Sequence, residues 1–236
     1  MTLSPFFQLQ SDLPREGPGT ADDVRWALSV VGPVARVCDA ACGPGADTVV
    51  LAADLPDAQI DAVDGQAHFV AEARRRCTSF GDRVRVWQGY MAELTGPYDL
   101  IWCAGALYFL GVAKGLQRWR GALAPGGYVA FSEPVWVDGN PPKAALEFWG
   151  QYPNITDRAG IGARIAEAGY SVLGTRRVIG QGWADYFDPL EARIAALRQS
   201  AGTDLTAVLD AEAADIADWR AAPDHIAYDL FVVTPQ

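Results

Sequence analysis

Two aspartates and a pair of glycines in the first third of the chain have the types and spacing of a nucleoside-binding turn. The stretch VCDAACGPGADTVVLA, residues 37–52, passes from apolar residues through Asp39 to Gly43 and Gly45, then resumes apolar residues at helical spacing. Glycines at a strand-to-helix turn let a ligand approach the backbone, and the first N–H groups of the helix have no partner within it. Such a turn favours a carboxylate or a phosphate.

A second acid follows at the distance expected for a ribose-binding group. The segment QIDAVDG carries Asp64, 21 residues after Gly43. An acid at the end of the second strand of a doubly wound sheet accepts hydrogen bonds from both ribose hydroxyls, so a nucleoside is the consistent ligand. Dinucleotide enzymes use a similar turn, but their third glycine is replaced here by Thr48. This lowers the support for NAD without excluding it.

These residues need a sheet whose strands end at one edge. Short apolar runs predict buried strands near residues 34–40, 58–63, 83–87, 98–103 and 127–132. Helical patterns at 46–54 and 112–123 lie between them, and Pro125, Gly126 and Gly127 are expected to end the second helix. The alternation predicts a Rossmann-like, doubly wound α/β fold with helices on both faces.

The second half of the chain predicts a cap and two further strands. Residues 134–157 are rich in Pro, Gly, Asn and aromatics, and we expect a partly helical cap over a pocket. Its aromatics either bind an apolar, aromatic or cationic acceptor or fasten the cap to the sheet; they are Trp136, Phe148, Trp149 and Tyr152. A helix near 157–168, a strand near 170–179, two helices between 188 and 221, and a final strand, HIAYDLFVV, complete the pattern.

Length and charge limit the classes of function. The 236 residues are expected to form a single domain, and a net charge of −10 without any Lys or Arg run disfavours a nucleic-acid partner. No secretion signal and no run of about 18 apolar residues is present, so we expect a soluble, cytoplasmic protein without membrane contact. The acidic helices between 188 and 221 form either a solvated face or the subunit contact of a homodimer. The four cysteines are expected to be reduced packing residues, with no metal site.

Five motifs together carry a family resemblance. DAACGPG, AVDG, VWQGYMAEL, YDLIWCAGALYF and LAPGGYVAF, in that order, resemble the class I S-adenosylmethionine-dependent methyltransferases. The resemblance covers nearly the whole chain and looks closest to bacterial small-molecule enzymes related to the ubiquinone and menaquinone C-methyltransferase group. It implies a seven-stranded, mostly parallel sheet with an antiparallel last strand, which agrees with the seven strands predicted above.

The resemblance also implies a site for S-adenosylmethionine, with S-adenosylhomocysteine as the product. Asp39, Gly43 and Gly45 would surround the methionine portion, and Asp64, followed by Gly65, would hold the ribose. The adenine would lie against Gly89, Tyr90 and Met91, and the sulfonium beside Ala104 and Gly105. The N-terminal segment, residues 1–20, would fold over the cofactor through Arg15, Gly17 and Gly19. Substrate contacts would come from Tyr108, Trp136, Trp149 and Tyr152.

The implied reaction needs few catalytic side chains. Methyl transfer from a sulfonium is an in-line displacement, so the protein mainly aligns the reactants and excludes water. A base is needed only when the acceptor loses a proton, and the candidates are Tyr108, Glu133 and His68. The alternatives for these residues are pocket shaping for Tyr108, orientation or ion pairing for Glu133, and an ordinary helix start for His68. Two other functions stay open, a nicotinamide-dependent oxidoreductase and a non-catalytic S-adenosylmethionine-binding protein.

Overall fold

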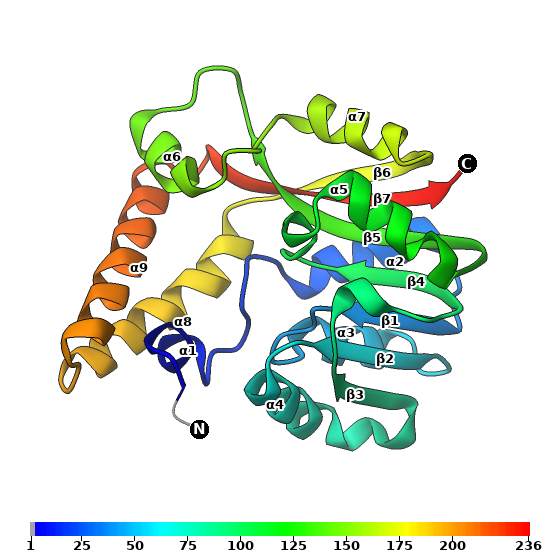
Figure 1. The fold of residues 1–236 in the computed structure, drawn as a ribbon, viewed down its shortest axis with the longest axis horizontal. Coiled ribbons are helices and arrows are strands. Elements are labelled where there is room, and N and C mark those ends of the chain that lie inside the picture. Colours follow the sequence, from blue (N-terminus) through cyan, green and yellow to red (C-terminus); the bar gives the residue numbers. More distant parts are fainter. Residues whose placement is uncertain (1–2) are drawn as a thin grey trace.

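A seven-stranded sheet forms the centre of the molecule in the computed structural model, which describes residues 3–236 (Figure 1). The strand order is β3-β2-β1-β4-β5-β7-β6, and β7 runs antiparallel to both of its neighbours. The strands are β1 (Arg36–Ala40), β2 (Gln59–Asp64), β3 (Val84–Gln88), β4 (Tyr98–Cys103), β5 (Leu123–Trp136), β6 (Tyr170–Val178) and β7 (Ile226–Pro235). The predicted sheet, with its antiparallel last strand, is confirmed.

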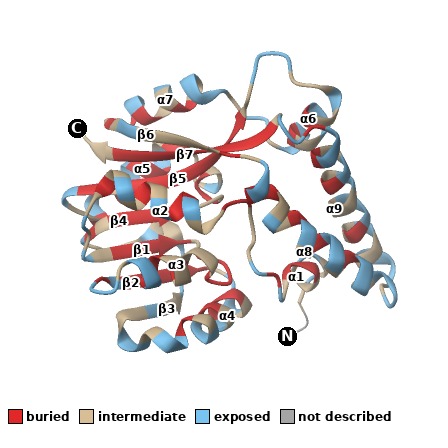
Figure 2. Cartoon of the chain, turned by 180° about the vertical axis from the view of Figure 1, so that it is seen from behind, coloured by how far each residue is buried: buried red, intermediate tan, exposed pale blue. Residues whose placement is uncertain are grey.

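Helices cover both faces of this sheet. One face packs against α2 (Ala21–Val31), α3 (Ala46–Asp54) and α4 (Ala67–Cys77), and the other against α5 (Val112–Trp119) and α7 (Arg158–Glu167). Leu51 of α3 shares one hydrophobic cluster with Leu100 of β4, and Trp119 of α5 shares another with the adjacent Ile101. Because successive strand residues face opposite sides, the continuous apolar run of β4 serves both layers. Figure 2 shows most residues of the central strands as buried.

A helical lobe lies beside the carboxyl ends of the parallel strands. It consists of α1 (Pro5–Gln10), α6 (Lys143–Phe148), α8 (Gln181–Arg198) and α9 (Thr203–Ala221), on the left in Figure 1. α1 packs on α8 and α9, and α6 packs on α9. The segment predicted as a cap, 134–157, supplies only α6 and the short turn Trp149–Gln151, while its first three residues continue β5. Both ends of the chain therefore help to build the cap.

The boundary between α5 and β5 differs from the prediction. α5 ends at Trp119 and β5 starts at Leu123, so the predicted helix was too long and the predicted strand began too late. The pairing with β4 shifts register between Tyr98 and Leu100. Gly126 has φ +76°, and a Cβ on Gly127 would lie 2.8 Å from the carbonyl oxygen of Tyr98. These glycines mark an irregularity inside the strand rather than its start.

Some helices were misread or missed. α8 begins at Gln181 and continues through Pro189, where the sequence predicted a start near residue 188. α2 was not predicted at all, although a capping box between Thr20 and Asp23 starts it. Among residues 3–236, no helix is long and apolar enough to cross a membrane.

Candidate cofactor and acceptor site

The glycine turn between β1 and α3 has three residues in left-handed backbone conformations. Ala41, Gly43 and Gly45 have φ values of 61°, 53° and 85°. A Cβ on Gly45 would lie 3.0 Å from the Cβ and 3.1 Å from the Cα of Ala73 in α4, so the turn depends on glycine there for space as well as conformation. The chain thereby leaves β1 sharply and exposes the backbone at the start of α3.

Asp64 joins this turn to the next one. Its Oδ2 accepts a hydrogen bond from the Gly43 N–H at 2.9 Å, and its Oδ1 accepts one from the Gln66 N–H at 2.8 Å. The side chain lines a pocket although only 8 % of the residue is exposed. Burial raises the pKa of Asp64, and the two backbone hydrogen bonds oppose that effect. Each carboxylate oxygen retains a lone pair for a ligand hydroxyl.

Asp39, at the end of β1, is the most enclosed acid of the site. It is 2 % exposed, and its Oδ2 accepts a hydrogen bond of 2.5 Å from the Thr48 hydroxyl. Burial, with a further contribution from the charge of Asp47, raises the pKa of Asp39 to about 8. Thr48, which stands where a dinucleotide enzyme has its third glycine, is thus a hydrogen-bond donor to the site.

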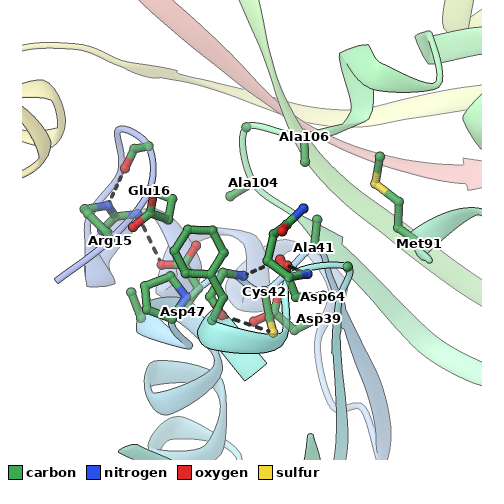
Figure 3. Close-up of a pocket in the computed structure, with 18 of the residues that line it drawn as sticks. Arg15, Glu16, Asp39, Ala41, Cys42, Asp47, Asp64, Met91, Ala104 and Ala106 are labelled. Atoms are coloured by element: carbon green, nitrogen blue, oxygen red, sulfur yellow. Dashed lines mark hydrogen bonds and ion pairs between the residues drawn. The ribbon is translucent and has the colours of Figure 1, made fainter. Parts of the chain in front are cut away.

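The N-terminal segment covers the glycine turn (Figure 3). Arg15 Nη2 lies 3.3 Å from Asp47 Oδ1, and the other oxygen of Asp47 accepts a 3.0 Å hydrogen bond from Trp102 Nε1. Glu16 lies so close to the turn that a Cβ on Gly43 would be 3.3 Å from its Cγ. Burial, and then the charge of Asp64, raise the pKa of Glu16 to about 9, and its buried Oε1 has no hydrogen-bond partner among residues 3–236.

These residues enclose a pocket of about 500 Å³ at the carboxyl ends of β1 to β4. In Figure 3, Arg15 and Glu16 lie across the pocket from Met91, with Ala104 and Ala106 on a third side. The predicted site residues that line it are Arg15, Gly17, Asp39, Gly43, Asp64, Gly65, Gly89, Tyr90, Met91, Ala104, Gly105 and Tyr108. Gly45 packs on α4 instead, and the Gly19 N–H donates to the Gly182 carbonyl oxygen at 3.1 Å.

Several lining residues were missed by the sequence analysis. Glu16 and Asp47 supply carboxylates, and Phe6, Phe7, Phe69 and Phe109 supply aromatic walls. The only available signal was position: Glu16 lies between Arg15 and Gly17, and Asp47 is an acid in the first turn of a helix, where a negative charge also complements the helix dipole. Phe6 and Phe7 reach the pocket because α1 packs on the distant helices α8 and α9.

Comparison with known proteins finds methyltransferases among the relatives of this chain. A family model described as a methyltransferase domain matches residues 37–127. An uncharacterized protein of Synechococcus is 40% identical over 98 residues, which are 39% of this chain and only 24% of that protein. A trans-aconitate 2-methyltransferase of Methylobacterium nodulans is 31% identical over 189 residues, covering 67% of this chain and 72% of that enzyme. The chain belongs to the class I S-adenosylmethionine-dependent methyltransferases.

A solved structure extends the likeness in fold to nearly the full length. The S-adenosylmethionine-dependent methyltransferase of Geobacter sulfurreducens, crystallised with S-adenosylhomocysteine, superposes with a TM-score of 0.85 at 20% identity and covers 98% of both chains. Membership of the family named above, and not this likeness in fold, implies S-adenosylmethionine as the cofactor.

The three candidate bases of the methyltransferase lie in different surroundings. Tyr108 lines the pocket, and its ring meets that of Tyr152 edge to face at 5.4 Å. Glu133, near the end of β5, does not line the pocket, is 5 % exposed, and has an Oε2 without a partner among residues 3–236. Burial raises the pKa of Glu133 to about 8, against the opposing charge of Arg164. The His68 ring meets that of Phe7 edge to face at 5.0 Å and that of Phe69 in a tilted arrangement at 4.1 Å.

Trp136, Trp149 and Tyr152, predicted to contact the substrate, do not line the pocket. Trp149 is 2 % exposed and packs in the helical lobe at 4.7 Å from Phe148, 5.9 Å from Trp183 and 6.0 Å from Tyr228. Trp136 packs against the same hydrophobic cluster. For the two tryptophans this arrangement agrees with the alternative that they fasten the cap to the sheet.

Proposed function

We propose that this methyltransferase transfers the methyl group of S-adenosylmethionine to a small-molecule acceptor held beside Gly105 and Tyr108. The observation that carries the proposal is the pocket that runs from Asp64 and the glycine turn to the loop after β4. A volume of about 500 Å³ lies in the range of small-ligand sites, which supports a small acceptor.

The residues of the pocket fit the chemical groups of the cofactor. Asp64 would accept hydrogen bonds from the ribose hydroxyls, and the N–H groups at the start of α3 would face the carboxylate. The unpartnered Oε1 of Glu16 and the carboxylate of Asp39 suit the amino group of the methionine portion. At Gly105, with φ +66°, the bare backbone leaves space that a side chain would fill. When bound, the cofactor supplies a methyl group already activated for displacement.

The contribution of the chain is then alignment and the exclusion of water. Phe6, Phe7 and Phe109 form apolar walls, and the segment Arg15–Pro18 covers one side. Holding acceptor and methyl group at contact distance converts a bimolecular reaction into an effectively unimolecular one. Burial raises the pKa of the Tyr108 phenol, which therefore stays protonated at neutral pH and orients the acceptor rather than acting as a base.

Narrower assignments remain predictions. The kinship with the ubiquinone and menaquinone group has no support from the relatives described above, one of which is named a trans-aconitate 2-methyltransferase. The homodimer, the single-domain organisation and the roles of individual site residues likewise remain predictions. The nicotinamide-dependent alternative is not favoured, because the related proteins are methyltransferases.

A turnover assay tests the proposal. The purified chain is incubated with methyl-labelled S-adenosylmethionine and pools of small acids, amines, phenols and alcohols, and S-adenosylhomocysteine is quantified. We expect acceptor-dependent release of S-adenosylhomocysteine and label in a small product. Cofactor binding without turnover in any pool would instead favour the non-catalytic binding protein.

A further inference from the structure

Charged and uncharged side chains lie in different parts of the pocket wall. The charged lining residues come from the N-terminal segment, the ends of β1 and β2, and the start of α3: Arg15, Glu16, Asp39, Asp47 and Asp64. The loop after β4, residues 104–109, contributes no charged side chain and one polar side chain, that of Tyr108. Figure 3 shows Ala104 and Ala106 of this loop on a different side of the pocket from Arg15 and Glu16. We call the side of the pocket at residues 104–109 the acceptor end.

Exposed aromatic rings lie where the pocket opens to solvent. Among residues 3–236, six large hydrophobic side chains are exposed, and three of them line the pocket. These three are Phe6 of α1, Tyr90 after β3 and Phe109 after β4, which are 45 %, 70 % and 73 % exposed, and we call them the aromatic rim. The other three are aliphatic and do not line the pocket: Leu146, Val172 and Leu173. The exposed aromatic side chains are therefore concentrated at this one pocket.

Neighbouring aromatic side chains hold two rings of the rim in place. The Phe109 ring lies 4.4 Å from that of Tyr108 in a tilted arrangement. Phe6 meets Phe7 edge to face at 5.3 Å, and Phe7 meets Phe69 in the same way at 6.0 Å. All five of these side chains line the pocket. Because exposed apolar surface is unfavourable in water and typically marks a binding groove when it borders a cleft, these rings provide a preformed surface for an apolar ligand.

The acceptor end has no partner for a charged group. Arg15 is the one cation among the described residues that line the pocket. Its Nη2 lies 3.3 Å from Asp47 Oδ1, and its Nε donates to the Gly17 carbonyl oxygen. A carboxylate is normally bound by an arginine or a lysine, and a charge that leaves water without such a partner is costly. The wall formed by residues 104–109 therefore favours an uncharged group.

Resting on the proposed function, we propose that the acceptor is an uncharged molecule with a flat apolar or aromatic body, seated on the aromatic rim, and one polar group at Tyr108. Tyr90 is expected at the adenine, which leaves Phe6 and Phe109 to contact the acceptor. Aromatic rings bind such a body by offset or edge-to-face packing, and the Tyr108 hydroxyl can donate or accept a hydrogen bond. This specificity differs from that stated by the name of the Methylobacterium relative, trans-aconitate 2-methyltransferase.

Probes that differ in one property at a time separate the effect of charge from that of apolar area. The chain saturated with S-adenosylhomocysteine is titrated, in NMR experiments, with 1-naphthaleneacetamide, its charged isostere 1-naphthaleneacetate, acetamide, and trans-aconitate. We expect 1-naphthaleneacetamide to bind at least tenfold more tightly than each of the other three. Equal or tighter binding of the charged isostere or of trans-aconitate would overturn the uncharged acceptor. An affinity no higher than that of acetamide would overturn the aromatic seat.

Substitutions at exposed positions locate the seat. Phe109→Ala should weaken 1-naphthaleneacetamide binding severalfold and leave S-adenosylhomocysteine affinity within a factor of two, and Phe6→Ala should weaken binding of the amide in the same direction. Leu173→Ala, at an exposed residue of β6 outside the pocket, should alter neither affinity. Unchanged affinity for the amide in both phenylalanine variants, or a dimer that Phe109→Ala dissociates in sedimentation, would reject the rim as the acceptor seat. Failure of S-adenosylhomocysteine to bind would count against the proposed function itself, so the two failures are distinguishable.

Discussion

Thr48 donates its hydroxyl hydrogen to Asp39 across 2.5 Å, beneath the turn that leads from β1 to α3. Thr48 is fully buried, and Asp39 lines the pocket. The hydrogen bond lowers the pKa of Asp39 against the larger effect of burial. Thr48, in place of the third glycine of dinucleotide enzymes, thus favours the ionised form of Asp39, an acid that the cofactor would contact.

Removing this hydroxyl should weaken cofactor binding. In Thr48→Val the pKa of Asp39 rises further above about 8, because burial is no longer opposed by the hydrogen bond. Asp47 and Asp64 also face Asp39 and act in the same direction. Wild-type affinity for S-adenosylmethionine should increase as pH rises through about 8, where Asp39 ionises, and in the variant this increase should move to higher pH.

Calorimetry between pH 6.5 and 9.5 measures both midpoints, and Thr48→Ser is the matched control because it keeps the donor. Coincident affinity profiles for the valine and wild-type proteins would mean that Asp39 does not meet the positive part of the cofactor.

Ala41 should be a point of backbone strain that glycine relieves. Its φ of 61° is in the left-handed region, which costs a residue with a Cβ about 1 kcal/mol. Ala41→Gly should therefore raise the free energy of unfolding, by up to about 1 kcal/mol. Ala40→Gly, one residue earlier in β1, should lower it, since a fully buried methyl group is lost from a strand. Urea unfolding measures the free energy of unfolding of both variants. A change of the same sign in both would contradict the backbone strain at Ala41.

Glu133 should make the ligand-free protein less stable as pH rises. Its folded pKa of about 8 lies above the unfolded value near 4.5, so the folded state holds the proton longer. Stability is highest below the unfolded value and falls until pH reaches the folded value. The groups that face Glu133 are Arg164 from α7, Cys103 from β4, and Tyr108, Tyr152 and Tyr228.

Glu133→Gln mimics the protonated acid at all pH values. Its melting temperature should exceed that of the wild type by a margin that grows between pH 5 and pH 8 and then levels off. A margin that is constant with pH would show that Glu133 is ionised in the folded protein.

Trp149 should matter for stability and not for the cofactor. Trp149→Ala removes a large side chain from the helical lobe, a change that typically costs about 3–5 kcal/mol. S-Adenosylhomocysteine affinity should remain within a factor of two in the part of the population that is folded. Trp149→Phe keeps an aromatic ring and should recover much of the melting temperature. A folded alanine variant with unchanged stability and weaker acceptor binding would restore the predicted substrate contact.

The sheet was predictable because its signals are local. The predicted bounds of β4, 98–103, match the structure, since a buried parallel strand reads as one apolar run. The start of β5 was misplaced because Gly126 and Gly127 have the composition of a turn but lie in a strand irregularity. Local patterns identify glycines but not the neighbouring carbonyl that makes them necessary.

The cap and the acceptor end were less predictable because they depend on contacts distant in sequence. Phe148 meets Trp183 at 5.5 Å, and α1 meets α8 and α9 from the opposite end of the chain. No motif links these segments, so the sequence placed the cap in residues 134–157 alone. Glu16 was overlooked for the same reason, since its role follows from how the N-terminal segment lies over Gly43.

The most direct test of the account is isothermal calorimetry with S-adenosylmethionine, S-adenosylhomocysteine and NAD, on the wild type and Asp64→Ala. We predict that both sulfur nucleosides bind and NAD does not, and that Asp64→Ala weakens binding by about 1–3 kcal/mol, the cost of an unsatisfied buried partner. Asp61→Ala, on the same strand but outside the pocket, should lower stability without this loss of affinity. Binding of NAD alone, or unaltered affinity in a folded Asp64→Ala protein, would contradict the account.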